Sequence, residues 1–322
     1  MPRFITIGGS TVAYLDFADG RRIGPQYGGN AFYSALGMRI WTDSVGIVSS
    51  VGARYPQAEI DRLSAAGFDV SGIHRRRSAR EFEVRLVYDA EGKRVYQPPG
   101  GVLSALQRYA PGLLGAVAGP MWRSLVPQAE DIPGEFLEAE GALVCASEYQ
   151  TQASIAQRLH GRVKAMILDP PTLVLQLHGT VPKGLVDLSI PDYVLPSEQE
   201  LFEYFGDDTA PLEGAGRLKQ LGARNVAVKL GERGSMVYDG RRGEWLTVPI
   251  YRTQVVDATG AGDAYGGGFL VGLVETGDPV QAALYGTVSA SYIIEDYGGE
   301  SALGATRAGA EARRQALQAQ MA

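Results

Sequence analysis

The sequence predicts an α/β protein whose central sheet is doubly wound, mostly parallel and covered by helices on both faces. Short segments rich in β-branched residues, such as 4–7 and 45–50, alternate along the chain with segments of helical periodicity, such as 55–67. Strands that alternate with helices are typical of parallel sheets. A second observation is a pair of alternating segments, 81–88 and 93–97, joined by a polar turn. This pattern predicts a hairpin, and with it a small β-sheet beside the main one.

The composition is that of an ordinary globular protein able to bury a large core. The chain has 322 residues, of which 45% are hydrophobic and 20% are charged. Its formal net charge of −6 and its isoelectric point near 5.3 argue against a dominant surface for nucleic acid or another polyanion.

The single cysteine and the absence of long apolar segments bear on the compartment. Cys145 rules out an intramolecular disulfide and suits a reducing environment. Its setting, Ala-Leu-Val-Cys-Ala, predicts a buried strand and a packing role. The first residues lack the long apolar segment of a signal peptide, and no run approaches the roughly 20 apolar residues of a membrane span. We therefore expect a cytoplasmic protein with no membrane partner.

The alternation of strands and helices continues to the end of the chain. The pair Gly28-Gly29 precedes a helix with a small face, and segment 103–128 carries little recognisable chemistry. The strand at 225–230 runs into a Gly-x-x-Gly turn, Gly231 to Gly234, and a second strand. The other predicted elements are strands 142–146, 164–168 and 193–195 and helices 151–160, 279–296 and 301–318.

The strongest chemical signal lies in segment 255–270. Two β-branched residues close a strand, Gly260 and Gly262 let the backbone approach a ligand, and a buried helix follows. The unpaired N–H groups at a helix start form an anion site. Asp263 lies inside this site, where bound phosphate would repel a merely structural carboxylate. Its useful role is to accept a proton from a hydroxyl that attacks the phosphate. The alternative is a close-packing turn in which Asp263 is a helix-start charge worth roughly 0.3–1 kcal/mol.

The full run Asp-Ala-Thr-Gly-Ala-Gly-Asp at 257–263 resembles the C-terminal signature of the ribokinase (PfkB) family of carbohydrate kinases, D-[TS]-T-G-A-G-D, with Ala258 in place of Thr or Ser. Gly28-Gly29 is similar to the family's N-terminal diglycine, and Lys-Leu-Gly-x-x-Gly at 229–234 to its nucleotide element. The resemblance covers nearly the whole chain. It implies a ribokinase-like fold: one kinase domain over residues 1–322, with a small β-sheet lid formed by parts of 10–27 and 75–100.

The resemblance also implies a reaction, the ATP-dependent transfer of the γ-phosphate to a hydroxyl of a sugar or sugar-like acceptor. Asp263 would be the general base. The N–H groups of Gly260, Ala261 and Gly262 would stabilise charge on the transferring phosphoryl group. The residues implied for the nucleotide are Lys229, Gly231, Gly234, Ser197 and Thr259. Those implied for the acceptor, beneath the hairpin, are Gly28, Gly29 and Asn30.

Two acidic residues are implied for metal ions. Ser197-x-x-Glu200 follows a predicted strand and resembles the family's N-x-x-E element, with Ser197 in place of Asn. Glu200 would hold the water shell of a phosphate-bound Mg²⁺, which needs few protein carboxylates. The alternative for this pair is a helix-start capping box. Asp257 would serve a potassium site beside the turn, which the resemblance raises as a further expectation.

The acceptor stays open because the chain departs from the family on that side. The family's usual acceptor-side residues are missing here, and the chain has Ala13, Tyr33 and Pro171 in their places. A nucleoside kinase of the same fold is therefore one alternative, and a sugar- or nucleotide-binding module without turnover is another. The basic residues of 74–77, with Arg80 and Arg85, either reach an anionic acceptor or form a solvated edge that discourages strand pairing. A homodimer through the lid is a further expectation.

Overall fold

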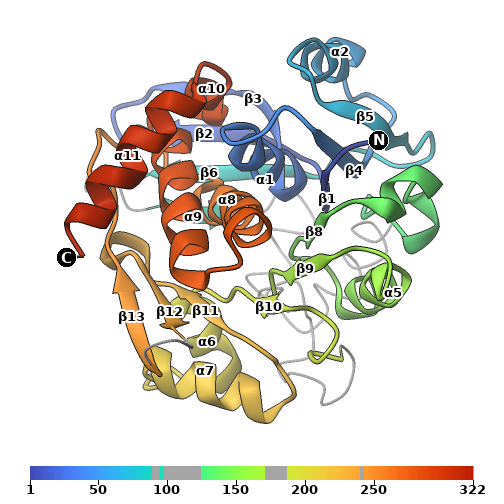
Figure 1. Cartoon of the computed structure of the whole chain (residues 1–322). Coiled ribbons are helices and arrows are strands. Elements are labelled where there is room, and N and C mark those ends of the chain that lie inside the picture. Colours follow the sequence, from blue (N-terminus) through green and yellow to red (C-terminus); the bar gives the residue numbers. More distant parts are fainter. Residues whose placement is uncertain (89–93, 98–124, 171–186, 240–242, 322) are drawn as a thin grey trace.

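The computed structural model of the protein describes residues 1–88, 94–97, 125–170, 187–239 and 243–321 (Figure 1). The polar turn predicted between the hairpin strands, most of segment 103–128 and Pro171 lie outside these residues.

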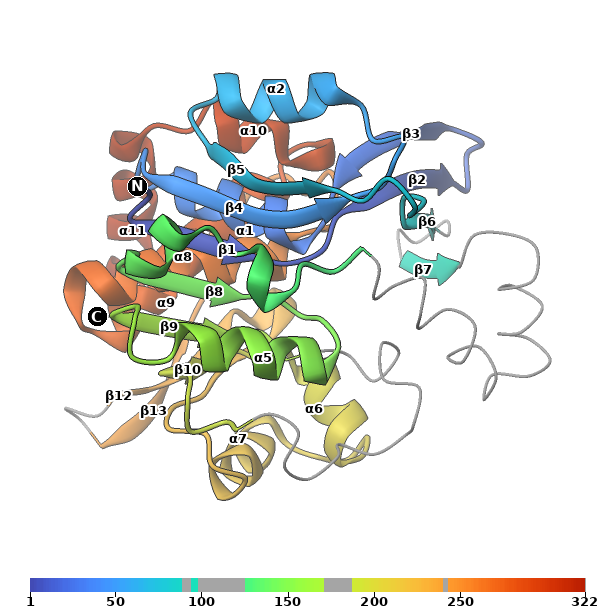
Figure 2. The same ribbon diagram turned by 90° about the vertical axis from the view of Figure 1, so that its right-hand side faces the viewer.

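The core of the fold is a six-stranded sheet in which every pairing is parallel. Its order is β10 (Tyr193–Val194), β9 (Ala165–Leu168), β8 (Gly141–Val144), β1 (Phe4–Ile7), β4 (Val45–Val51) and β5 (Asp69–Arg75). The first strand is central, and the chain adds strands on one side of it and then on the other. The predicted doubly wound sheet is confirmed. In such sheets ligands bind beyond the carboxyl ends of the strands, near the point where the order reverses. In Figure 2 these ends point to the right.

Helices cover both faces of this sheet because its strands are apolar on both faces. Phe4 and Leu143 pack against α1 (Asn30–Arg39) and α8 (Ala261–Thr276), with α9 (Pro279–Ile293) outside them. Neighbouring residues such as Ile5 and Val144 point to the other face, which α5 (Tyr149–Leu159) and the 3₁₀ turns η1 (Ala129–Asp131) and η2 (Gly134–Glu138) cover. Helix α2 (Gln57–Ala65) lies against β5.

Helix α8 lies between the sheet, α1 and α9, as its small and apolar sequence predicts. Three consecutive glycines let the neighbouring helices approach its backbone. A Cβ on Gly267 would lie 3.1 Å from the amide nitrogen of Met38 in α1, and one on Gly268 would lie 2.6 Å from the carbonyl oxygen of Tyr285 in α9. The start of α8 is therefore held on a rigid, closely packed base.

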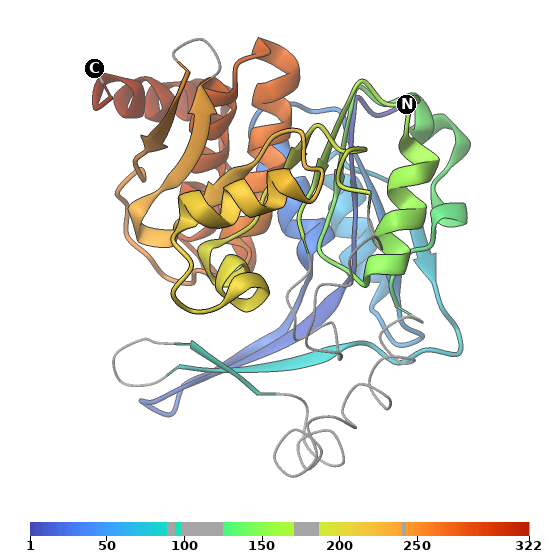
Figure 3. The same cartoon turned by 90° about the horizontal axis from the view of Figure 1, so that it is seen from below.

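A second sheet has four strands in the order β3 (Arg22–Gly28), β2 (Thr11–Phe17), β6 (Glu83–Tyr88) and β7 (Arg94–Gln97). The predicted hairpin pair is confirmed as the antiparallel pair β6 and β7, whereas β2 and β6 are parallel. One face is apolar and buries Ala13, Leu15 and Val84. Figures 2 and 3 show this four-stranded sheet beyond the carboxyl ends of the parallel strands.

A third, antiparallel sheet continues from the edge of the parallel one. It consists of β11 (Ala227–Lys229), β12 (Ser235–Asp239) and β13 (Glu244–Val248), and single bridges join Val194 to Val226 and Ser197 to Lys229. Helices α6 (Glu198–Phe205) and α7 (Pro211–Gln220) lie beside it.

The last predicted helix is broken into α10 (Glu300–Leu303) and α11 (Arg307–Ala319), because the Thr306 side chain caps a new helix start at the Gly309 N–H. Within the described ranges, no helix has the length and apolarity that crossing a bilayer requires.

Candidate active site

The turn at Gly260 has the backbone shape that the sequence predicts. Gly260 has φ = 80° and ψ = 0°, a left-handed conformation, and it is the residue from which α8 begins. A Cβ at this position would lie 2.6 Å from Cδ2 of Tyr33, so only glycine fits there. Asp263 is the third residue of α8, in its first turn. Its carboxylate is thereby attached to the positive end of a buried 16-residue helix.

The first N–H groups of α8 differ in their partners. The Ala261 N–H donates to the carbonyl oxygen of Ala258 at 3.3 Å, so this member of the expected anion hole is engaged in the turn itself. Within the described residues, the N–H groups of Gly260 and Gly262 donate to no backbone carbonyl. A cavity of about 640 Å³ opens here. Its lining includes Ala261, Gly262, Lys229, Gly231 and Gly234, together with apolar side chains from the C-terminal half.

Lys229, at the end of β11, is the buried cation that lines this cavity beside Gly262, and Arg252 lines it as well. Its Nζ donates to Oδ1 of Asp169 at 2.6 Å, and both side chains are about nine-tenths buried, with 13% and 10% exposed. The same Nζ lies 3.7 Å from the position of a Cβ on Gly262. Burial alone lowers the pKa of Lys229, but the charges of Asp169, Glu200 and Asp263 outweigh burial and raise that pKa above its ordinary value. Lys229 therefore stays an ammonium, with three carboxylates acting on it.

Asp169 belongs to this cluster although the sequence did not single it out. The signal that could have found it is its place directly after β9, because the carboxyl ends of parallel strands meet at one edge of the sheet. Gln152, in α5, holds the ends of β8 and β9 together, because its side-chain amide donates to the carbonyl oxygens of both Cys145 and Asp169. Cys145 itself is buried, and burial raises its pKa to about 12, as the predicted packing role requires.

Glu200 forms the capping box that was the alternative to its metal role. Its Oε2 accepts from the Ser197 N–H at 2.6 Å, and its own N–H donates to Oγ of Ser197 at 3.2 Å. The side chain is buried, and burial raises its pKa to about 7. The cap uses one carboxylate oxygen, so it is compatible with a metal role, which stays a prediction.

The diglycine turn lies on the other side of Tyr33. Gly29 has φ = 129°, and a Cβ there would lie 2.8 Å from Cα of Ser10. The side chain of Asn30 accepts from the Gly9 N–H at 2.9 Å and donates to the carbonyl oxygen of Ala146 at 2.7 Å. Asn30 thus ties together the segments that follow β1 and β8, which uses part of the hydrogen-bonding capacity expected to serve the acceptor.

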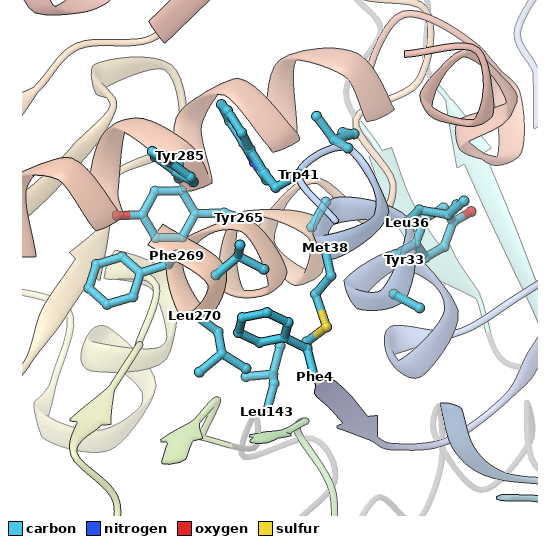
Figure 4. Packing of buried hydrophobic residues seen from close by; sticks show 14 of the residues in the cluster. Phe4, Tyr33, Leu36, Met38, Trp41, Leu143, Tyr265, Phe269, Leu270 and Tyr285 are labelled. Carbon is cyan, nitrogen blue, oxygen red and sulfur yellow. The ribbon is translucent and has the colours of Figure 1, made fainter. Parts of the chain in front are cut away.

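Tyr33 separates the two glycine turns that the sequence assigned to acceptor and phosphate. Its ring contacts the position of a Cβ on Gly28 at 3.2 Å and on Gly260 at 2.6 Å, and the residue is 7% exposed. Figure 4 shows it on α1 near Leu36. The two turns therefore meet around one aromatic ring, although they lie far apart in the sequence.

Asp257 begins the turn before α8 (residues 257–260), called the phosphate-side turn below because the sequence predicts phosphate binding there. Asp257 is almost fully buried, with 4% exposed. Its Oδ1 accepts from the Thr259 N–H at 3.0 Å and from the hydroxyl of Tyr88 at 2.7 Å. The Tyr88 hydroxyl also lies 3.5 Å from Oγ1 of Thr259. The potassium role expected of Asp257 stays a prediction.

Comparison with known proteins identifies the family. The model of the pfkB family of carbohydrate kinases matches residues 133–305, more than half of the chain. The protein belongs to the pfkB family. The expected resemblance is thereby confirmed. The matched segment includes the turn at 257–263 and strand β11, which ends at Lys229.

Relatives of this pfkB kinase phosphorylate hydroxyl acceptors of two kinds. It is 26% identical to the cytidine kinase of Thermococcus kodakarensis, over 83% of this chain and 87% of that protein. It is 28% identical to the ribokinase of Haemophilus influenzae, over 56% of this chain and 65% of that protein. The protein is therefore a phosphotransferase with a hydroxyl acceptor, a sugar or a nucleoside.

Solved structures share the fold of this pfkB kinase across its length. The ribokinase of Thermotoga maritima superposes with a TM-score of 0.69 at 21% identity, covering 98% of this chain and all of that one. The nucleoside kinase of Methanocaldococcus jannaschii gives a TM-score of 0.71 at 17% identity, covering 98% of each chain. The predicted ribokinase-like fold is confirmed.

Proposed function

We propose that this pfkB kinase transfers the γ-phosphate of ATP to a hydroxyl of a small-molecule acceptor, with Asp263 as the general base. The observation that carries this proposal is the place of Asp263 in the first turn of α8, beside the ammonium of Lys229. A carboxylate at an anion site opposes phosphate binding unless it takes part in the chemistry. Proton acceptance from the attacking hydroxyl is the role that gains from this position.

The cavity at the start of α8 suits a nucleoside triphosphate. Lys229 lies beside Gly262 in its lining, which favours phosphate, and the lining also includes apolar residues such as Ile250, Ala290 and Ile294, which favour a base. An Escherichia coli protein of the same fold has a crystal structure that contains ATP and Mg²⁺. Gly231 and Gly234 line the same cavity, in keeping with the nucleotide role proposed for that turn.

The residues around Lys229 also fit Mg²⁺. In the part of the chain that the structure describes, no three acidic, histidine or cysteine side chains form a ready cage for a metal ion. Mg²⁺ does not need one, since it keeps several waters and binds through one or two carboxylates plus phosphates. Three carboxylates acting on one ammonium leave surplus negative charge, which favours a cation. Burial raises the pKa of Glu200, the charge of Lys229 opposes that rise, and the charge of Asp169 adds to it. We propose that Glu200 holds the water shell of this ion, whose chemistry is to neutralise charge on the phosphate oxygens.

In the proposed transfer, the acceptor hydroxyl gives its proton to the Asp263 carboxylate while its oxygen attacks the γ-phosphorus. The bond from the γ-phosphorus to the bridging oxygen breaks, and ADP leaves with that electron pair. Lys229 and the N–H groups of Gly260 and Gly262 stabilise charge on the phosphoryl oxygens. Asp169 holds Lys229 in place for this task through the 2.6 Å ion pair.

We further propose that the four-stranded sheet is the lid over the acceptor, because it lies beyond the carboxyl ends of the parallel strands (Figure 3) and has one apolar face. Two features favour a nucleoside over a simple sugar. Tyr33 places an aromatic ring at the acceptor turn, and the lid face carries Ala13 and Leu15 rather than polar groups. The buried side chains of Ala13 and Leu15 offer no partners to the hydroxyls of a sugar, and apolar surroundings favour a nucleobase. The cytidine kinase relative points the same way.

The test is an ADP-release assay over a panel of sugars and nucleosides, with Asp263→Asn beside the native protein. We expect kcat to fall by at least ~10²-fold while ATP binding is kept, the usual scale for losing a general base. Asp278→Asn is the matched control, because Asp278 caps α9 and asparagine caps equally well. Turnover near that of the native protein in Asp263→Asn would refute the assignment. No turnover with any acceptor would instead favour a binding module.

A further inference from the structure

Tyr88 links the four-stranded sheet to the phosphate-side turn. It is the last residue of β6, and its hydroxyl donates to Oδ1 of Asp257 at 2.7 Å, across 169 positions of sequence. The same hydroxyl lies 3.5 Å from Oγ1 of Thr259. Asp257 and Thr259 belong to the turn that leads into α8, so one hydroxyl from the lid reaches the residues that shape the proposed anion hole.

Asp257 is well placed to set the conformation of this turn. Its Oδ1 accepts from the N–H of Thr259, two residues ahead, which closes a side-chain turn just before Gly260. Its own N–H and that of Val256 donate to the carbonyl oxygen of Ile294 at 3.3 and 2.7 Å, which anchors the backbone to the end of α9. With the backbone held there, the Asp257 carboxylate also holds the direction of the Thr259 N–H, one residue before Gly260.

The ring of Tyr88 is held independently of its hydroxyl. It stacks on Phe17 of β2 with centroids 5.0 Å apart and planes 13° from parallel, and Phe17 meets Tyr297 edge-on at 5.9 Å. The aromatic contacts therefore fix the ring to its own sheet, and only the hydroxyl reaches Asp257. Removing the hydroxyl leaves the packing intact but leaves a buried carboxylate with one donor fewer.

We propose that Tyr88 is a positioning residue that acts through Asp257: its hydroxyl orients the carboxylate, so the turn before α8 takes its reactive shape only when the lid lies against it. This inference rests on the proposed phosphotransfer. It adds that phosphoryl transfer depends on closure of the lid, because an open lid withdraws the Tyr88 hydroxyl from Asp257. A phosphoryl group would then be less exposed to water before the acceptor is covered.

The test compares Tyr88→Phe with Tyr14→Phe, which removes a hydroxyl from the opposite face of the same sheet. We expect Tyr88→Phe to lower kcat about tenfold, with both KM values within about threefold and a melting temperature lowered by no more than about 5 °C for the lost hydrogen bond. Tyr14→Phe should match the native protein. A lowered melting temperature with native kcat would mean a purely structural role and would overturn the proposal.

A double-mutant cycle then tests the route through Asp257. In an Asp257→Ala background, Tyr88→Phe should change kcat by less than about twofold, because its partner is gone. A full tenfold drop in kcat on adding Tyr88→Phe to that background would contradict the inference. If Asp257→Ala does not fold, Asp257→Asn replaces it, and the effect of Tyr88→Phe should drop to about threefold. Asp263→Asn, assayed in parallel, reports on the proposed function separately, since its result does not depend on Tyr88.

Discussion

Replacing Lys229 by methionine removes the ammonium that faces the buried carboxylates of the site while keeping most of the apolar stem. In the native protein Nζ lies 2.6 Å from Asp169, and the two side chains are 13% and 10% exposed. Removing one partner of such a pair leaves an uncompensated buried charge. This typically costs about 3–5 kcal/mol of the free energy of unfolding, a large part of the roughly 5–15 kcal/mol that keeps a domain folded.

The loss should depend on pH in a defined direction. Burial already raises the pKa of Glu200 to about 7, and the charge of Lys229 opposes that rise. Without the ammonium, the pKa values of Asp169 and Glu200 in the folded protein rise further above their unfolded values. A carboxyl group with a raised folded pKa destabilises the fold as pH rises through that pKa. The loss in Lys229→Met should therefore be larger at pH 8 than at pH 6, where both groups can take up protons.

Urea denaturation at the two pH values measures this difference. Lys164→Met is the matched control, because Lys164 pairs with Glu140 at 3.6 Å but its side chain is 74% exposed. An exposed pair of this kind should contribute no more than about 1 kcal/mol. A loss in Lys229→Met below 1 kcal/mol, or one that is equal at both pH values, would refute the electrostatic account of the cluster.

Two further variants test the turn and the metal role. Gly260→Ala should lower the free energy of unfolding by about 1–2 kcal/mol for its left-handed backbone, and by more for the overlap with Tyr33. Gly277→Ala isolates the backbone cost, because Gly277 is also left-handed but has no atom within 4 Å of its Cβ position. Equal losses for the two variants in urea denaturation would contradict the overlap. Glu200→Gln should raise the Mg²⁺ concentration for half-maximal rate, whereas an unchanged Mg²⁺ curve would leave only the capping box, which glutamine can also form. Because the pKa of native Glu200 is about 7, the native protein loses stability between pH 4.5 and 8 relative to Glu200→Gln, by up to about 3 kcal/mol at 1.36 kcal/mol per pKa unit.

Local patterns in the sequence were sufficient for the fold class and for the turn at 257–263. Alternating strands and helices indicate a parallel sheet because each segment carries its own period, and the Gly260 turn is encoded by consecutive small residues. The Ser197 capping box was also visible as a local pattern, and the structure contains it. These features depend on residues within a few positions of one another, so they can be derived without knowing how distant segments pack.

The contacts that assemble the proposed active site could be decided only by the tertiary structure. Lys229 meets Asp169 across 60 positions, and Tyr88 meets Asp257 across 169. Tyr33, noticed in the sequence only as a departure from a family pattern, lies against Gly260. The sequence alone therefore determined that the chain is an α/β protein with a glycine turn at 257–263 and an acid at the start of the helix that follows. Strand order and the placement of the four-stranded sheet decided which side chains serve that turn, because those pairings depend on segments that no local pattern connects.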